Sequence, residues 1–166
     1  MSELKSLMLR EPRLTLAVAE SLTCGRLQAR IGAISGASEF FLGGMTAYSL
    51  EQKVRHLGVD RAGAQAVNCV SATVAEQMAR GVCALFGSDV GVATTGYAEP
   101  SAQWNVDEPF GWWALARRLP TGSYETLRGR VECAGLSRVD AQERVAAAAL
   151  EALAGWVRGP AAGCTP

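Results

Sequence analysis

Residues 14–21, LTLAVAES, decide the fold of this chain of 166 residues. Residues 14–19 form an apolar run without alternating polar positions, which is typical of a strand buried on both faces of a sheet. The polar residues Glu20 and Ser21 follow at once, and LQARI, which has helical spacing, comes a few positions later. A buried strand that leads into a helix predicts an α/β domain.

The segments downstream continue this alternation of strands and helices. Further strands are expected at residues 43–48, 89–96, 110–118 and 123–133. Further helices are expected after the capping residues Ser49, Ser71 and Ser137, the first of them over residues 50–57. The sequence therefore predicts a three-layer α/β/α sandwich with a mixed β-sheet. One domain is expected over residues 1–159, followed by a flexible tail at 160–166.

Charge and hydropathy exclude several classes of protein. The 16 basic and 16 acidic residues cancel, so the chain lacks the surplus of Lys and Arg that nucleic-acid binding requires. No stretch approaches the about 20 uncharged apolar residues of a membrane span. Glu3, Lys5 and Arg10 interrupt the start before a signal peptide could form. We therefore expect a cytoplasmic protein that binds neither nucleic acid nor a membrane.

The five cysteines form no CxxC pair and leave one unpaired, which is a poor disulfide framework and a poor zinc site. They are Cys24, Cys69, Cys83, Cys133 and Cys164. We expect free thiols, with no metal and no cofactor. The tryptophan-rich strand is compatible with a homo-oligomer, and Trp112 and Trp113 must point to opposite faces of the sheet.

Polar residues gather where three predicted strands end, at the edge where α/β sheets usually bind ligands. Ser21 follows the first strand, Tyr48 the second, and residues 94–96 the third. Ser21 could act as a nucleophile, with helix-start N–H groups stabilising the oxyanion. The alternative is that Ser21 or Thr23 caps the helix, which is the better interpretation of this segment alone. Residues 94–96 could contact a ligand or form an ordinary strand exit.

A serine nucleophile needs a base, and the candidates are few. The only histidine, His56, is expected in the last turn of a helix, where a structural role is favoured. The two lysines are Lys5, in a start that we expect to be unstructured, and Lys53. Lys53 lies near the same edge as Ser21, but it must lose its proton, so its pKa of about 10.4 has to be lowered. Composition alone predicts a solvated lysine.

Five blocks of sequence, in order from Leu14 to Leu115, resemble the CinA C-terminal domain family. The blocks are LTLAVAESLTCGRLQARI, GASEFFLGGMTAYSLEQKVRHLGV, CVSATVAEQMARG, VGVATTGYAEP and EPFGWWALA. The resemblance implies an α/β/α domain that deamidates nicotinamide mononucleotide to nicotinate mononucleotide and ammonia, a step of pyridine nucleotide salvage. The implied partner is this small nucleotide substrate.

The resemblance also implies roles for individual residues. Ser21 is the implied nucleophile, Lys53 the group that moves its proton, and Tyr48 the residue that holds or assists this pair. The implied oxyanion and substrate-binding residues are Thr23, Cys24, Gly25, Thr95, Gly96 and Arg138. Among these, the N–H groups from Thr23 to Gly25 are expected to hold the oxyanion, and Arg138 to meet the substrate phosphate.

Two departures from the family pattern leave other functions open. Cys24 replaces the first glycine of the family's TGG, and Glu99 replaces a glycine in a loop where a phosphate would be expected. Two like charges about 4 Å apart repel by about 4 kcal/mol at an effective dielectric of 20. The chain could therefore be a catalytically silent paralogue that binds a ligand or a partner. It could also be an amidase for a different, less anionic amide.

Overall fold

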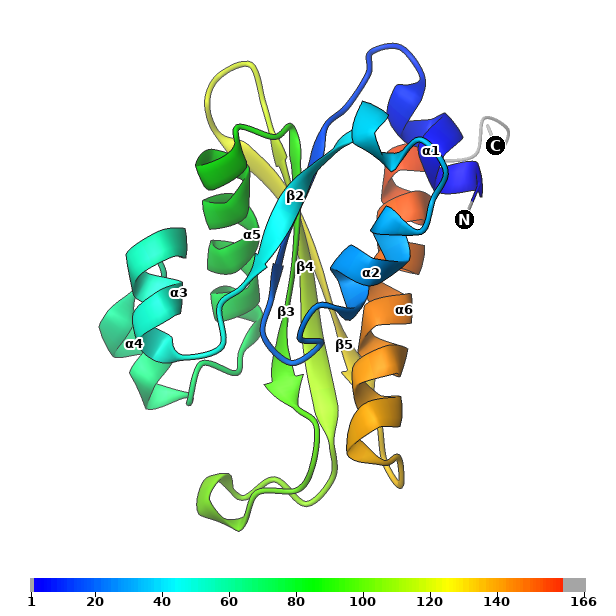
Figure 1. Cartoon of the computed structure of the whole chain (residues 1–166). Helices are drawn as coiled ribbons and strands as arrows, with labels where there is room; N and C mark the ends of the chain where they lie inside the picture. Colours follow the sequence, from blue (N-terminus) through cyan, green and yellow to red (C-terminus); the bar gives the residue numbers. More distant parts are fainter. Residues whose placement is uncertain (1, 160–166) are drawn as a thin grey trace, which may run out of the picture.

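Five strands form one mixed sheet in the computed structural model, which describes residues 2–159 (Figure 1). The strand order is β2-β1-β3-β4-β5. The strands are β1 (Leu16–Glu20), β2 (Phe41–Thr46), β3 (Val90–Tyr97), β4 (Phe110–Arg118) and β5 (Tyr124–Glu132). β1 pairs in parallel with both neighbours, whereas β4 is antiparallel to β3 and β5. The tail expected at 160–166 lies outside the described residues.

Helices cover both faces of this sheet, so the predicted α/β/α sandwich is confirmed (Figure 1). One layer contains α3 (Leu50–Leu57), α4 (Arg61–Ala66) and α5 (Ala72–Phe86). The other contains α1 (Ser2–Leu9), α2 (Arg26–Gly32) and α6 (Arg138–Arg158). Two short 3-10 helices lie at Ala37–Glu39 and Ala102–Trp104. No helix of the described chain is long and apolar enough to cross a lipid bilayer.

The three predicted capping serines begin helices as expected. The side chains of Ser49, Ser71 and Ser137 accept hydrogen bonds from backbone N–H groups at the starts of α3, α5 and α6. α3 ends at Gly58, whose φ of +63° lies in the left-handed region that favours glycine. These local contacts define where α3 begins and ends.

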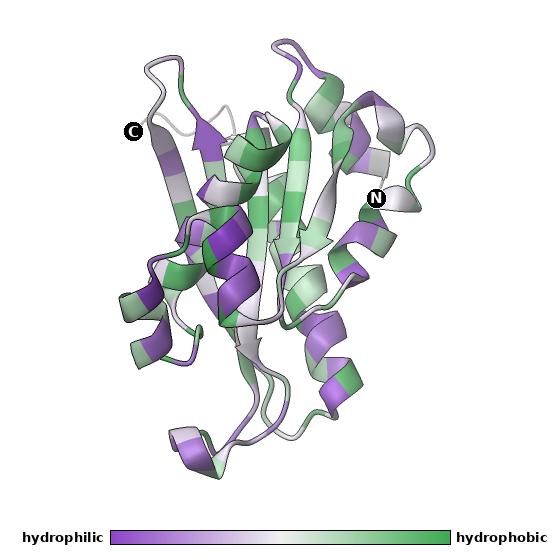
Figure 2. Cartoon of the chain, turned by 60° about the vertical axis from the view of Figure 1, so that its left-hand side comes forward, coloured by the Kyte–Doolittle hydropathy of each residue, from purple (hydrophilic) through white to green (hydrophobic). Residues whose placement is uncertain are grey.

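The core lies on both faces of the central strands. Every residue of β1 is buried, and Figure 2 shows the central strands as the most hydrophobic part of the sheet. One apolar cluster lies under α5, and a second lies under α1, α2 and α6. Trp112 packs against the first cluster and Trp113 against the second, which confirms that these two side chains point to opposite faces.

The start of the chain is a helix, so the expectation that Lys5 lies in an unstructured segment is wrong. α1 buries Leu4 and Met8 in the second cluster and contacts α6. Eight residues are too few to be stable as an isolated helix, and tertiary packing supplies the stabilisation. α4 was not expected either, because its sequence RAGAQA carries little apolar periodicity.

A close contact at Gly81 sets the distance between α3 and α5. A Cβ atom added at Gly81 would overlap the backbone carbonyl of Leu57 and lie 2.7 Å from its Cα. The two helices can approach this closely only because position 81 has no side chain. Gly81 therefore determines how near α3 lies to α5.

We expect Gly81→Ala to lower the free energy of unfolding by about 1–3 kcal/mol, because α3 must move away from α5. Gly155→Ala is the matched control, since a Cβ atom there meets nothing within 4 Å. The control should gain about 0.5–1 kcal/mol from helix propensity. Urea unfolding of both variants tests this contact, and equal stability of the two would contradict it.

Candidate active site

A cavity of about 530 Å³ opens at the carboxyl ends of the parallel strands. Ser21 borders it directly after β1, and its backbone N–H donates to Thr94 O on β3 at 3.0 Å. This bond continues the strand pairing by one residue and fixes the backbone that carries the hydroxyl. The cavity has the size of a typical small-molecule site.

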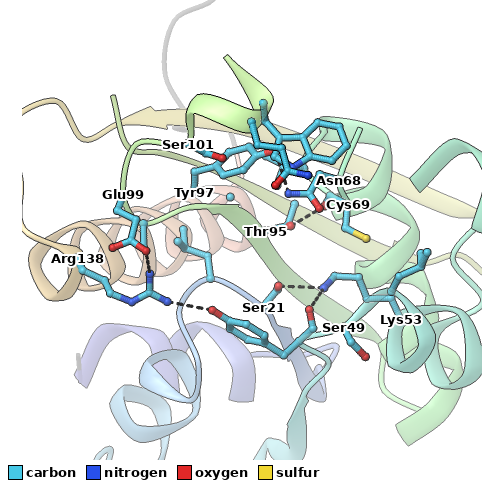
Figure 3. Close-up of a pocket in the computed structure, with 18 of the residues that line it drawn as sticks. Ser21, Ser49, Lys53, Asn68, Cys69, Thr95, Tyr97, Glu99, Ser101 and Arg138 are labelled. Carbon is cyan, nitrogen blue, oxygen red and sulfur yellow. Dashed lines mark hydrogen bonds and ion pairs between the residues drawn. The ribbon is translucent and has the colours of Figure 1, made fainter. Parts of the chain in front are cut away.

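The side chain of Lys53 reaches Ser21 inside this cavity (Figure 3). Its Nζ donates to Ser21 Oγ at 3.0 Å and to the backbone carbonyl of Tyr48 at 2.7 Å. Lys53 is 1% exposed, although composition alone predicted a solvated residue. The contacts with the Ser21 hydroxyl and the Tyr48 carbonyl hold the amine in one place, within reach of the proton on Ser21.

Burial lowers the pKa of Lys53 from 10.5 to about 8, and the nearby Cys69 opposes this shift. Burial disfavours the charged form of an amine because the low-dielectric interior solvates it poorly. At pH 7 about a tenth of the molecules then have a neutral Lys53, which is the form that can accept a proton.

Glu20 fixes the turn that follows Ser21. Its buried carboxylate accepts from the backbone N–H groups of Gly25, Leu27 and Gln28 at 2.9–3.0 Å. The Thr23 hydroxyl donates to the same carboxylate at 2.6 Å. A carboxylate is stabilised at a helix start by such N–H groups and by the helix dipole. Glu20 thus caps α2, and the alternative that Ser21 or Thr23 does so is wrong.

The structure does not bring Thr23, Cys24 and Gly25 to the cavity, because the turn that contains them folds toward Glu20. Thr23 is fully buried, and the N–H of Gly25 is already bonded to Glu20. Cys24 is exposed, with a φ of +49° that explains why a glycine suits this position. The prediction that N–H groups from Thr23 to Gly25 face an oxyanion is therefore not supported for Gly25.

The backbone of Tyr48, rather than its phenol, supports the Ser21–Lys53 pair. The Tyr48 side chain is 56% exposed, and its hydroxyl accepts from Arg138 at 3.0 Å. Arg138, the first residue of α6, also donates to Glu99 at 2.9 Å. Arg138 and Glu99 both line the cavity, where the family resemblance had implied a substrate phosphate.

Thr95 and Gly96 line the cavity, but structural contacts explain both. The Thr95 hydroxyl donates to Cys69 O at 2.7 Å, which joins the loop before α5 to β3. A Cβ atom added at Gly96 would overlap Phe110 O and lie 2.7 Å from the Cα of Gly111. Glycine is therefore required at position 96 for pairing with β4.

Aromatic side chains and free thiols complete the surroundings. Tyr97 and Trp104 line the cavity, and Tyr97 receives a 3.2 Å hydrogen bond from Asn68. Cys69 also lines it, and the four cysteines of the described chain are free thiols. Residues 2–159 contain no group of three His, Cys, Asp or Glu side chains that could hold a metal ion.

Sequence reasoning did not identify Glu20, Asn68 and Cys69. Glu20 had a usable signal, since a charged residue at the end of an apolar strand must find a partner if it is buried. Asn68 and Cys69 have no such signal. They reach the cavity through a turn with left-handed backbone at both positions, which no pattern in the sequence indicates.

These features define an α/β/α domain with a serine and a buried lysine in contact at the carboxyl edge of its sheet. The family model described as the CinA C-terminal domain matches residues 1–157. The chain therefore belongs to the CinA C-terminal domain family.

Relatives and solved structures agree with this assignment. CinA-like proteins from Chlorobium limicola and Chlorobaculum tepidum are 41% and 42% identical over 86% and 74% of the chain. The chain spans about a third of the length of these curated relatives, with 33% and 29% covered. A CinA superfamily protein from Enterobacter cloacae matches with a TM-score of 0.84 and 26% identity, over 93% of this chain and 88% of that one. Competence damage-inducible protein A from Klebsiella pneumoniae has a TM-score of 0.81 and 27% identity, over 96% and 98%.

We expect Lys53→Met to raise the free energy of unfolding at pH 7 by about 1–2 kcal/mol, because the folded chain no longer buries a charge. In the native sequence, folding releases the Lys53 proton between pH 8 and 10.5. The unfolded chain binds more protons in this window, so stability should rise with pH there.

This rise should disappear in Lys53→Met and persist in the control Arg55→Met, an exposed position on the same helix. Denaturant unfolding at pH 7, 8.5 and 10 measures it. A Lys53→Met variant that is less stable at pH 7 and keeps the rise would contradict the burial of a charged amine.

Proposed function

We propose that this chain is a serine amidohydrolase that hydrolyses the carboxamide of a nicotinamide nucleoside or nucleotide. Nicotinamide mononucleotide is the substrate that the family resemblance implies. The observation that carries the proposal is the 3.0 Å contact between Ser21 Oγ and the buried Nζ of Lys53. A hydroxyl next to an amine of lowered pKa is an arrangement that makes a serine nucleophilic.

In the first half of the reaction, Ser21 Oγ attacks the carboxamide carbon while neutral Lys53 takes the hydroxyl proton. The tetrahedral intermediate then collapses, the C–N bond breaks, and Lys53 returns the proton to the leaving nitrogen. Ammonia leaves, and an ester joins the substrate to Ser21. The Tyr48 carbonyl keeps Nζ aimed at Ser21 in both proton transfers.

In the second half, a water attacks the ester carbon and gives its proton to Lys53. The ester bond breaks, and the proton passes from Lys53 to Ser21 Oγ. The carboxylic acid product leaves, so the two half-reactions consume one water and release one ammonia. Lys53 ends in its neutral starting form, as a catalyst must.

The oxyanion needs donors other than Gly25. The backbone N–H of Leu22, the residue after the nucleophile, has no hydrogen-bond partner among residues 2–159. Leu22 also lines the cavity. We assign this N–H as a donor to the developing oxyanion, since the residue after a nucleophilic serine performs this role in other hydrolases.

A ligand-binding module without catalysis is the second candidate. It is favoured because the Gly25 N–H already donates to Glu20 and is not free to stabilise an oxyanion. A binding module needs no nucleophile, so Ser21 would not react with a serine-directed fluorophosphonate. Covalent labelling of Ser21, absent in Ser21→Ala, would exclude this candidate.

We expect Ser21→Ala to lower ammonia release from nicotinamide mononucleotide or nicotinamide riboside by about a thousandfold or more, because the nucleophile is lost. Ser71→Ala is the control, since Ser71 caps α5 outside the cavity. The control should lose about 1 kcal/mol of stability and keep its activity. A Ser21→Ala variant with full activity would refute the mechanism.

The pH dependence of kcat/KM should report the titration of Lys53. Activity should rise with pH and level off above about pH 8, where Lys53 is neutral. The value at pH 7 should be about a tenth of the plateau. Initial rates of ammonia release between pH 6 and 9.5 test this, and an activity that falls as pH rises through 8 would exclude Lys53 as the base.

A further inference from the structure

Within the part of the chain that the structure describes, three charged side chains line the cavity, and all three have partners. They are Lys53, Glu99 and Arg138. Lys53 is bound by Ser21 and Tyr48 O, as described above. One terminal nitrogen of the Arg138 guanidinium donates to Glu99 and the other to the Tyr48 hydroxyl (Figure 3).

The charges of these groups sum to zero in the reactive state. Lys53 must be neutral to accept the Ser21 proton, and Glu99 then cancels Arg138. A cavity in this state offers no net positive charge to an anion. Its remaining lining includes the rings of Tyr97 and Trp104, which suit a planar ring.

A substrate phosphate would meet two obstacles at Arg138. It must displace Glu99 from the guanidinium, which is a small cost because the Glu99 side chain is 64% exposed. It must then lie beside the displaced carboxylate, which the loop after β3 keeps near the cavity. Repulsion between these like charges, screened by water, adds to this cost.

A phosphate would also act on the base. A negative charge in the cavity favours the protonated form of Lys53 and so reduces the fraction that can accept a proton. A substrate without a phosphate has neither effect. The Glu99–Arg138 ion pair therefore disfavours a phosphorylated amide in binding, and the phosphate itself disfavours the neutral form of Lys53.

We infer that Glu99 is a specificity-determining residue which makes this site select the unphosphorylated substrate, nicotinamide riboside, over nicotinamide mononucleotide. This inference rests on the proposed amidohydrolase function and narrows its substrate class. Glu99 acts by neutralising Arg138 and by repelling a phosphate. It takes no part in the reaction at the carboxamide.

The test compares kcat/KM for the two compounds, which differ only in the phosphate. The native sequence should prefer the riboside by about tenfold. Glu99→Gln, which keeps the shape and removes the charge, should shift the ratio toward the mononucleotide by about tenfold. Asp107→Asn is the matched control from the same loop, does not line the cavity, and should leave the ratio unchanged.

A native preference for the mononucleotide, or a ratio that Glu99→Gln leaves unchanged, overturns the inference. If neither compound releases ammonia, the proposed function fails instead, and binding decides the inference separately. Calorimetric Kd values for both compounds are then measured in Ser21→Ala with and without Glu99→Gln. A lower Kd for the riboside than for the mononucleotide, with a difference that disappears in Glu99→Gln, supports selection by charge. Equal Kd values for the two compounds, or no binding of either, overturn the inference.

Discussion

The burial of the Lys53 amine is the constraint on which the site depends. An ammonium taken out of water is costly unless it is paired, and among residues 2–159 Lys53 donates to a hydroxyl and a carbonyl and to no carboxylate. The end of β1, the turn after β2 and the first turn of α3 must all be in place to provide this environment. The protein thus keeps a group of lowered pKa beside Ser21, and groups with perturbed pKa values cluster at functional sites.

Glu20 supports this arrangement from the other side of Ser21. Its carboxylate ties the turn before α2 to the end of β1, so the backbone that carries Ser21 is held at both ends. Glu20 is a second buried ionisable group, but its carboxylate accepts hydrogen bonds from four donors. Burial affects the two groups differently, because hydrogen bonds stabilise the Glu20 carboxylate whereas the Lys53 ammonium is left poorly solvated.

The fold was largely predictable because local signals and packing agree. The apolar run of β1 and the serines that begin α3, α5 and α6 are signals within a few residues of sequence. α1 lacked such a signal, because contacts with the distant α6 stabilise it.

The site was predictable to a lesser degree. The edge that holds Ser21 and Lys53 followed from topology, and the roles of these residues came from the family resemblance. The burial of Lys53 and the selection of Glu20 as the cap of α2 depend on three-dimensional packing, which spacing alone does not encode. The pairing of Glu99 with Arg138 also joins elements that only the folded chain brings together.

Tyr48 links the two halves of the cavity through different parts of one residue. Its carbonyl contacts the lysine, and its phenol contacts Arg138. Because every amino acid has a carbonyl, the side chain at this position can vary in evolution without removing the support of the reactive amine. Under the proposed function, diversification of the outer pocket is thereby uncoupled from the groups that transfer the proton, and libraries randomised at position 48 are a route to new amide preferences.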